Sequence, residues 1–243
     1  MHRAERETIM NQTAIITGAS RGLGLELARA LARRGWALAL DARHAGPLEA
    51  VRLELEPLTS VVALAGDVRD SAHLAELVER AGRLGPLTAV VNNASLLGPS
   101  PQPTLAGYPI SVLREVYEAN VFAPLRLLQL AIPRLEPGAR IVNVTSDAGI
   151  EKYEGWGGYG SSKAALEQLS GVLAAEHPEL RVYWVDPGDM RTQMQQEAFP
   201  GEDISDRPPP SDSVPAILTL LDGDLPSGRY RSSGLSAGLE VKS

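Results

Sequence analysis

Tyr159 and Lys163 lie four residues apart in a stretch whose apolar residues follow helical spacing. Residues four apart share one face of a helix, so the phenol and the ammonium would point the same way. Ser146 lies shortly before them, at the end of an apolar, strand-like run that begins at Ile141. An acidic hydroxyl, a cation and a small hydroxyl could therefore converge on one site, although such spacing also arises by chance.

A tyrosine can act as an acid or a base near neutral pH only if its phenolate is stabilised. The pKa of free tyrosine is about 10, and closing the gap to neutral pH requires roughly 4 kcal/mol. One cation at about 4 Å supplies about this much at an effective dielectric constant near 20. Lys163 is placed to be that cation, and the positively charged ring of a bound cofactor could be a second.

The elements that must position these residues are predicted by the apolar pattern. Short apolar runs alternate with stretches of helical spacing, and no internal repeat or domain boundary interrupts them. The expected strands cover residues 13–17, 36–40, 61–65, 88–91, 139–145, 181–185 and 229–231, and the expected helices run from the turn at 18–24 to 34 and over 48–56, 70–83, 111–135, 159–176 and 213–221. The alternation predicts a three-layer α/β fold, a doubly wound parallel sheet of about seven strands in a single domain over 11–243.

Ligands of such sheets bind beyond the carboxyl ends of the strands, where Gly18, Arg43, Asp67 and Asn92 are expected. The glycines at 18–24 would let backbone amides approach a phosphate at the amino terminus of a helix. A plain tight turn into a helix would have the same composition.

The end of the second strand gives conflicting signals. In a dinucleotide-binding fold an acid there selects the free 2′-hydroxyl of the adenosine ribose, and an arginine accommodates a 2′-phosphate. Asp41 is such an acid, whereas Arg43 and Arg21 could both reach a phosphate. A solvated loop charge is the alternative for each of the three.

Pro124 lies inside the helix expected at 111–135. A proline there lacks the amide that would bond the carbonyl four residues back, which belongs to Asn120. The sequence therefore predicts a freed carbonyl at Asn120 that could hold a water molecule, and the alternative is a kink that serves packing alone.

Composition excludes several other classes of protein. The chain has 243 residues, no cysteine and four scattered histidines, so it offers no thiolate chemistry and no recognisable metal motif. Its net charge of -7 argues against nucleic acid as the main partner. No apolar run is long enough for a bilayer, and residues 1–10 are expected to form a flexible arm rather than a secretory signal. A cytoplasmic, metal-independent protein with no membrane partner is expected.

Taken together, these positions resemble the short-chain dehydrogenase/reductase family, over residues 11–232. The turn from Thr17 to Gly24 resembles the family's TGxxxGxG motif. Asn92-Asn93-Ala94 resembles its NNAG motif, but Ser95 replaces the glycine, which predicts a more strained turn. The residues at the positions of the family's catalytic tetrad are Asn120, Ser146, Tyr159 and Lys163.

The resemblance implies a Rossmann-type fold and an NAD(P)-dependent oxidoreductase. Hydride would pass between the nicotinamide and a carbonyl or secondary alcohol, with Tyr159 exchanging the hydroxyl proton and Ser146 binding the substrate oxygen. Lys163 would lower the pKa of Tyr159 and bind the nicotinamide ribose, and Asn120 would hold a water. The residues that the resemblance assigns to the cofactor are Gly18, Ser20, Arg21, Gly22, Leu23, Gly24, Arg43, Asp67, Val68, Asn93, Ala94, Tyr159, Lys163, Pro187, Gly188 and Thr192.

Alignment with the family favours NADP, because Arg43 and Arg21 fall where NADP-preferring members carry basic residues; NAD is the alternative. The substrate pocket is expected from residues 95–108, 147–156 and 189–210, the last forming a flap. The alternative functions are a non-catalytic or redox-sensing NAD(P)-binding protein and a dehydratase or epimerase. The helices at 111–135 and 156–176 resemble those that pair subunits in the family, which implies a homodimer or homotetramer.

Overall fold

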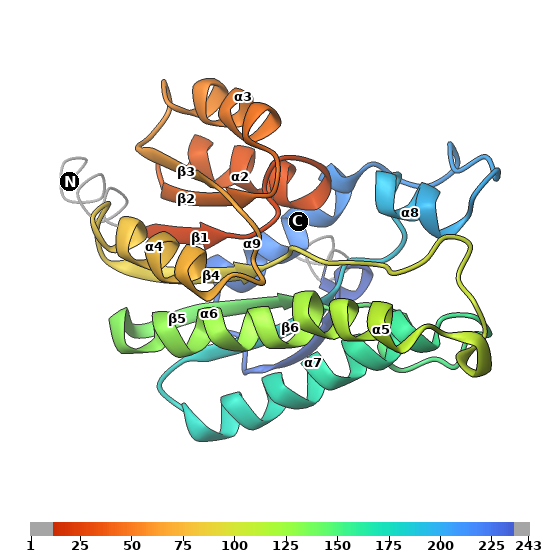
Figure 1. The fold of residues 1–243 in the computed structure, drawn as a ribbon. Coiled ribbons are helices and arrows are strands. Elements are labelled where there is room, and N and C mark those ends of the chain that lie inside the picture. The colour runs from red at the N-terminus through yellow and green to blue at the C-terminus, as the bar shows by residue number, and fades with distance from the viewer. Residues whose placement is uncertain (1–11, 236–243) are drawn as a thin grey trace.

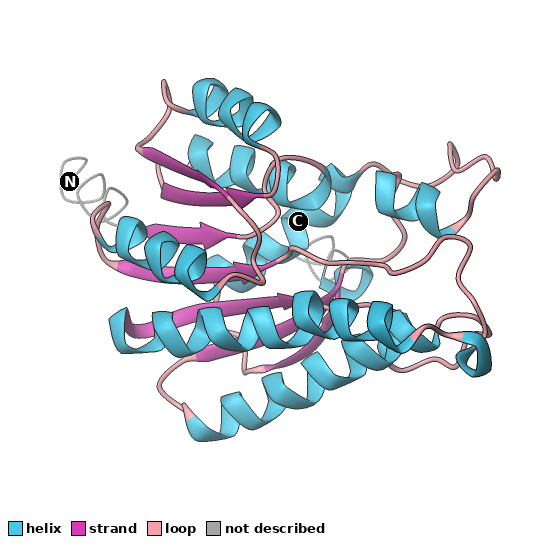
Figure 2. Ribbon diagram, viewed as in Figure 1, coloured by secondary structure: helices cyan, strands magenta, loops and turns pink. Residues whose placement is uncertain are grey.

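The structure, a computed structural model, describes residues 12–235. The arm predicted at residues 1–10 lies outside the described residues, as do residues 236–243. The described chain is built around one sheet of seven parallel strands in the order β3-β2-β1-β4-β5-β6-β7 (Figures 1 and 2). The strands are β1 (Thr13–Ile16), β2 (Ala37–Ala42), β3 (Val61–Ala65), β4 (Leu87–Asn92), β5 (Leu135–Val144), β6 (Arg181–Asp186) and β7 (Gly228–Arg231). The predicted doubly wound Rossmann-type sheet is confirmed.

Helices cover both faces of the sheet (Figure 1). On one face α2 (Gly22–Arg33), α3 (Ala45–Leu55) and α9 (Val214–Asp222) pack around a buried apolar layer. On the other face a second layer is covered by α4 (Ser71–Gly82), α6 (Ala123–Ala131) and α7 (Gly157–Glu176). Because both faces are covered, β1 is buried along its whole length and β4 at all but one residue, with no alternation of buried and exposed positions.

The helix predicted over residues 111–135 is interrupted and ends early. α5 (Ile110–Tyr117) passes into a π-helical turn (Glu118–Phe122), then into α6 and a short 3-10 turn (Ile132–Arg134). The backbone N–H of Ala123 bonds the carbonyl of Glu118, five residues back, just before Pro124. The missing amide of Pro124 is thus accommodated by a widened turn that contains Asn120. β5 starts at Leu135, earlier than the predicted residue 139.

β2 extends past its predicted end at residue 40. It continues to Ala42, and Asp41 pairs in register with Leu64 of β3. Asp41 therefore belongs to the sheet and not to the loop that follows it, which changes what its carboxylate can reach.

Candidate active site

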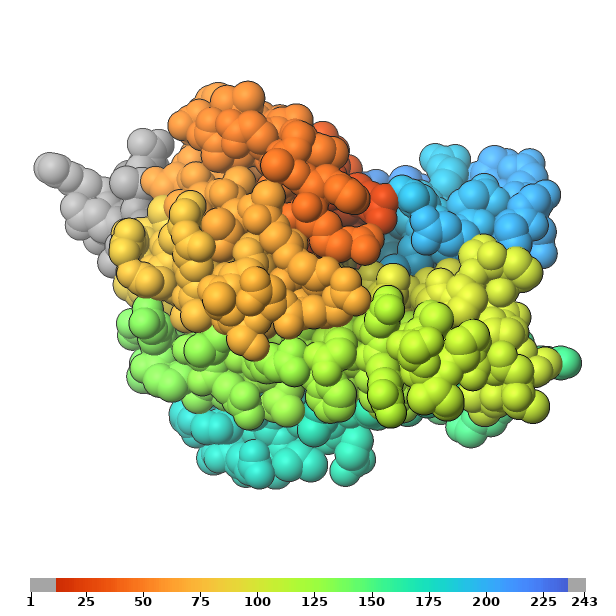
Figure 3. Space-filling model, viewed as in Figure 1, coloured from red at the N-terminus to blue at the C-terminus, as the bar shows by residue number. Residues whose placement is uncertain are grey.

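A cavity of about 650 Å³ lies beyond the carboxyl ends of the strands. The sheet order reverses between β1 and β4, and such a switch point leaves a crevice for a ligand. In Figure 3 the blue segment that carries α8 (Gln193–Ala198) stands against the red residues that follow β1. Every site residue predicted from the sequence lines this cavity, except Gly24 and Asn120.

Tyr159 and Lys163 are buried near the start of α7. The Lys163 Nζ lies 5.4 Å from the centroid of the Tyr159 ring and donates a hydrogen bond to the Val144 carbonyl at 2.8 Å. Gly160 permits this packing, because a Cβ there would lie 2.5 Å from the Ala148 carbonyl oxygen. The ammonium and the phenol ring share one side of the helix, as their spacing predicts.

Burial acts on the two groups in opposite directions. It raises the pKa of the Tyr159 phenol above its usual range, and Asp186 and Asp147 raise it further, whereas a hydrogen bond with the Ser95 hydroxyl lowers it. Burial also lowers the pKa of Lys163 to about 8, which leaves the ammonium largely protonated at neutral pH. The lowering of the Tyr159 pKa expected from Lys163 stays a prediction, since Ser95 is the lowering group here.

Ser146 follows β5 and faces the cavity beside Asp147. Its hydroxyl donates to Asp147 Oδ1 at 3.0 Å and accepts from the N–H of Ala148 at 3.2 Å. The second oxygen of the same carboxylate accepts from the Tyr153 hydroxyl at 3.0 Å. A substrate oxygen that binds Ser146 must therefore compete with Asp147 for its single proton.

Asn120 is fully buried in the π-helical turn, and its side chain forms hydrogen bonds to two other segments of the chain. Oδ1 accepts from the Leu96 N–H at 2.7 Å and from the Ser95 hydroxyl at 3.1 Å. Nδ2 donates to the Leu96 carbonyl and to the Ser162 hydroxyl, each at 2.9 Å. The side chain thus joins the segment after β4 to α7, and a water on its carbonyl stays a prediction.

The glycine turn is held against the end of β4. Gly18 has φ of 67°, in the left-handed region that favours glycine. The Asn93 Nδ2 donates to the carbonyls of Thr17 and Gly18 at 2.9 and 3.1 Å. A Cβ on Gly24 would lie 2.5 Å from both the Asn93 Nδ2 and the Gly18 carbonyl oxygen. Gly24 therefore acts outside the cavity, by letting α2 approach the turn.

The strain predicted at Ser95 is wrong. No residue other than glycine has positive φ between residues 12 and 235, so the position does not need the conformational freedom of glycine.

Asp41 is sequestered at the cofactor end of the cavity. Its side chain is 2% exposed, and Oδ2 lies 2.6 Å from the Nε2 of His73 on α4. The Gly18 N–H lies 3.3 Å from Oδ1, and the Ala19 N–H bonds the Asp41 carbonyl at 2.8 Å. Asp41 therefore anchors the glycine turn, and its carboxylate is already occupied by His73 and Gly18.

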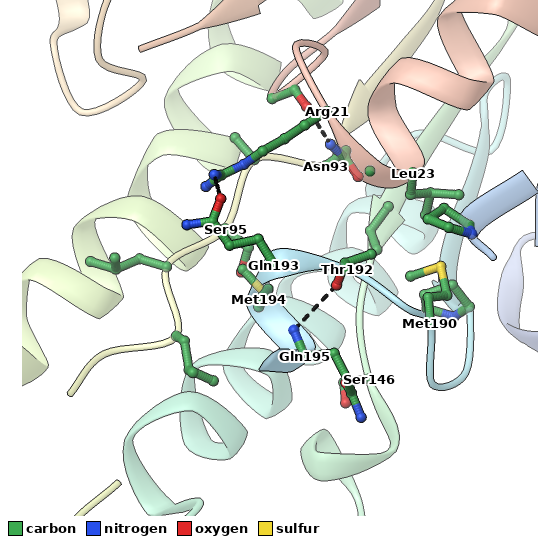
Figure 4. A pocket seen from close by; sticks show the side chains of 18 of the residues that line it. Arg21, Leu23, Asn93, Ser95, Ser146, Met190, Thr192, Gln193, Met194 and Gln195 are labelled. Carbon is green, nitrogen blue, oxygen red and sulfur yellow. Dashed lines mark hydrogen bonds between the residues drawn. The ribbon is translucent and has the colours of Figure 1, made fainter. Parts of the chain in front are cut away.

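Arg43 is exposed at the same end of the cavity, next to the buried Ala42. Arg21 crosses from the glycine turn to α8, where its guanidinium donates to the Gln193 side chain (Figure 4). Gln193 donates in turn to Glu197 at 2.7 Å. The segment predicted as a flap is thereby tied to the glycine turn by side chains.

Asp67 follows β3, where the resemblance expects an adenine contact. Its carboxylate receives several hydrogen bonds from Arg69, which hold its pKa below the usual range. Asp67 and the neighbouring Val68 both line the cavity.

Thr192, Pro187 and Gly188 line the wall that follows β6. Thr192 caps α8 by accepting from the Gln195 N–H at 3.2 Å (Figure 4). Gly188 has φ of 76° and open space around a built Cβ.

The other end of the cavity is mainly apolar. Leu97 and Tyr159 form a buried cluster against which Trp156, Met194 and Ala198 pack. The Trp156 ring makes an edge contact with Tyr159 at 5.9 Å between centroids. Of the loops predicted to line the substrate pocket, only 95–97, 147, 156, 189–195, 198 and 210 do so.

Between residues 12 and 235, no group of three or more His, Cys, Asp or Glu side chains is arranged to hold a metal ion. Within the same range, the helices are all too short or too polar to cross a membrane.

Comparison with known proteins identifies the family of the chain. The short chain dehydrogenase family model matches residues 12–203. The chain is 32% identical to the uncharacterized oxidoreductase YciK of Escherichia coli K12, over 92% of both chains. The chain belongs to the short-chain dehydrogenase family.

The chain is also similar to two other members of the family. The chain is 31% identical to the (S)-benzoin-forming benzil reductase of Saccharomyces cerevisiae, over 77% of this chain and 75% of that one. A relative from Shigella flexneri 2a, solved in complex with NADP, superimposes with a TM-score of 0.83 at 31% identity and covers 93% of this chain and 98% of its own.

The donors of this short-chain dehydrogenase fit a dinucleotide. Arg21, the residue before α2, provides no side-chain cap to the helix. The first amides of α2 and the positive-φ glycines Gly18 and Gly22 therefore offer backbone to the cavity. Arg21 and Arg43 add positive charge to the wall of the same cavity.

The sequence interpretation missed His73, and it placed Asp147 and Gln193 in the loops expected to line the pocket without predicting their contacts. A signal for His73 existed, because Asp41 falls in an apolar strand and a buried carboxylate needs a partner. Asp147 and Gln193 lie in loops whose paths the pattern does not specify.

Proposed function

We propose that this short-chain dehydrogenase is an NADP-dependent oxidoreductase of carbonyl compounds and secondary alcohols, with Tyr159 as its general acid and base. The observation that carries the proposal is the arrangement along one cavity. The glycine turn lies at one end, and Tyr159, Lys163 and Ser146 gather at the other.

NADPH, when bound, supplies the hydride for the carbonyl carbon. Gly18, Gly22 and the start of α2 would hold its phosphates, and Pro187, Gly188 and Thr192 would hold its nicotinamide end. Ser146 turns from Asp147 to donate to the substrate oxygen. Tyr159 would give its proton to that oxygen in reduction and take it back in oxidation, and the Lys163 ammonium would stabilise the phenolate and bind the ribose.

The preference for NADP is supported by the contacts of the buried Asp41 carboxylate. An acid that selects NAD must face the ribose, but Asp41 is held by His73 and Gly18. Arg43 and Arg21 remain as partners for a 2′-phosphate, and the Shigella relative was solved with NADP. NAD is the weaker alternative.

For the substrate, we favour a carbonyl that carries a bulky apolar group. The wall beyond Tyr159 and Ser146 is made by Leu97, Trp156 and Met194, which offer aromatic and aliphatic contact. The benzil reductase among the relatives acts on a compound of this kind.

Assembly and location stay predictions of the sequence. The proposed dimer or tetramer is supported by Phe122, in the π-helical turn, and Val172, on α7, which are large apolar side chains 42% and 43% exposed.

The test is turnover of a panel of aromatic and aliphatic ketones, diketones and aldehydes with NADPH and with NADH. Tyr159→Phe should bind NADPH as the wild type does and lose activity by orders of magnitude. Tyr230→Phe, whose hydroxyl bonds Pro226 outside the cavity, is the matched control. Near-normal turnover by Tyr159→Phe would refute the assignment, and NADPH binding without turnover in the wild type would favour the non-catalytic alternative.

A further inference from the structure

Glu167 lies one turn of α7 beyond Lys163, just as Lys163 lies one turn beyond Tyr159. The Glu167 side chain is only 13% exposed. A buried carboxylate is stable only if it is paired with a cation and hydrogen-bonded, and the spacing along the helix places Lys163 within its reach. The Lys163 ammonium instead lies 5.4 Å from the centroid of the Tyr159 ring and bonds the Val144 carbonyl at 2.8 Å.

Arg229 on β7 supplies the cation with which Glu167 is paired. Its Nε donates to Glu167 Oε1 at 3.1 Å and to Oε2 at 3.2 Å. The Thr145 hydroxyl adds a bond to Oε1 at 2.7 Å. The Arg229 side chain is 19% exposed, so the pair is largely shielded from solvent, where loss of one partner leaves the other charge uncompensated.

Arg229 also contacts two strand ends that border the site. Its Nη2 donates to the Ser146 carbonyl at 3.3 Å and lies 3.6 Å from Asp186 Oδ2. The other oxygen of the Asp186 carboxylate accepts from the Gly188 N–H at 3.0 Å. Ser146, Asp186 and Gly188 all line the cavity, whereas Arg229 does not. The guanidinium therefore acts on the site from outside the cavity.

The charges on α7 show why Glu167 needs this partner. Lys163 is the one cationic residue of the helix, and Glu167 raises its pKa against the larger effect of burial. Without the guanidinium, Glu167 would keep the Thr145 hydroxyl, which carries no charge to neutralise it. The ammonium one turn away would then be drawn to the carboxylate, and so away from the phenol ring and the Val144 carbonyl.

We propose that Arg229 is a positioning residue for Lys163: by pairing with Glu167, it keeps that carboxylate from drawing the ammonium away from Tyr159. Arg229 itself contacts neither the nucleotide nor the substrate, and it takes no part in proton transfer. The inference rests on the proposed function, in which the Lys163 ammonium stabilises the Tyr159 phenolate.

Arg229→Gln is the decisive variant, because it removes the charge and keeps a donor for the Ser146 carbonyl. With a ketone that the wild type reduces, kcat should fall about tenfold, since a displaced ammonium stabilises the phenolate less. Removing the stranded carboxylate as well, in Arg229→Gln/Glu167→Gln, should restore kcat to within about threefold of the wild type. A role in packing alone predicts the opposite, because the double variant loses more of the native bonds.

Arg231→Gln is the matched control. Arg231 lies on the same strand, 3.5 Å from the same Asp186 Oδ2, and makes no ion pair with Glu167. Its loss should leave kcat unchanged, and Arg229→Lys, which keeps the cation, should remain close to the wild type. A wild-type kcat in Arg229→Gln, or a double variant as slow as the single one, would overturn the proposal.

A second measurement needs no turnover, and so separates failure of this inference from failure of the proposed function. The chain has three lysines, Lys152, Lys163 and Lys242, so protein labelled with carbon-13 lysine gives three sets of side-chain signals that can be titrated with pH. The Lys163 signal is identified by its absence in Lys163→Met.

The Lys163 midpoint should rise by about one unit in Arg229→Gln, because an unneutralised carboxylate favours the charged ammonium. It should return to the wild-type value in the double variant. Glu167→Gln alone, which leaves Arg229 charged, should lower it, and this variant keeps the test open if Arg229→Gln does not fold. A midpoint that is unchanged in either single variant refutes the role of Arg229, even if no ketone is ever reduced.

Discussion

The carboxylate of Asp41 and the imidazole of His73 meet 2.6 Å apart inside the fold, directly behind the glycine turn. The pair joins β2 to α4, and the same carboxylate lies 3.3 Å from the Gly18 N–H. The Asp41 carboxylate thereby holds the glycine turn against β2 and α4.

The pair makes stability depend on pH. The hydrogen bond to Asp41 raises the pKa of His73 above its unfolded value, against the opposing effect of burial. The stabilisation from protonated His73 is therefore complete below about pH 6.5 and is lost as the pH rises through the higher folded pKa. His73→Gln, which keeps a donor for Asp41, should lower the free energy of unfolding more at about pH 6 than at about pH 9. Urea titrations across this range test it, and a constant difference would contradict the assignment.

Lys163 should cost stability in exchange for its chemistry. Burial lowers its pKa to about 8, and the difference from the free value corresponds to a penalty of roughly 3 kcal/mol. The penalty is complete below about pH 8 and is relieved as the pH rises toward the unfolded value of about 10.5. After the lost hydrogen bond to Val144 is subtracted, Lys163→Met should be more stable than the wild type by about 1–2 kcal/mol near pH 7.

That gain should shrink above about pH 8, while turnover is lost at every pH. Urea unfolding near neutral pH decides the point, and a Lys163→Met protein less stable than the wild type would contradict it.

Gly24 and Gly46 offer a matched pair of glycine-to-alanine substitutions in helices. A Cβ at Gly24 would lie 2.5 Å from two atoms of the glycine turn, whereas a Cβ at Gly46, in α3, meets nothing within 4 Å. Gly24→Ala should lower the melting temperature and weaken NADPH binding at least tenfold. Gly46→Ala should leave binding unchanged and stabilise the protein by up to about 1 kcal/mol. Thermal unfolding and fluorescence titration of both variants provide the comparison, and equal behaviour would contradict the packing argument.

Arg43 should set the nucleotide preference. Loss of a charge-assisted contact to a 2′-phosphate costs about 1.5–3 kcal/mol, so Arg43→Ala should weaken NADPH binding by about ten- to a hundredfold. NADH, which lacks that phosphate, should bind almost as before. Arg83→Ala, on the exposed surface of α4's carboxyl end, removes the same charge outside the cavity and is the control. Parallel loss of NADH and NADPH affinity, or tighter binding of NADH by the wild type, would reject the preference.

The order of strands and helices could be predicted because each apolar run is bounded by polar or glycine-rich turns. The residues that line the cavity could be predicted from that order, since parallel strands bring their carboxyl ends to one edge of the sheet. The boundaries that failed have local causes. Pro124 was expected to bend one long helix, but the chain forms a π-helical turn just before it. Asp41 was placed after the end of the second strand because a charged residue is not expected inside a buried strand, yet β2 continues to Ala42.

What sequence spacing could not supply is the direction of individual side chains. Asp41 and Arg43 are two residues apart, yet Asp41 is buried next to the glycine turn and Arg43 is exposed. Ser95 was recognised as a departure from the family motif, but its contact with Asn120 depends on how the π-helical turn packs against the segment after β4. That contact joins residues 25 positions apart, and no local pattern encodes it.

The contact between Arg21 and Gln193 has a consequence for how a nucleotide is retained. Only Nη1 of the Arg21 guanidinium donates to Gln193, and a guanidinium has five N–H donors. A phosphate bound by Arg21 would therefore use the remaining donors while the bond to Gln193 stays in place. The nucleotide, the glycine turn and α8 would then be joined through one side chain.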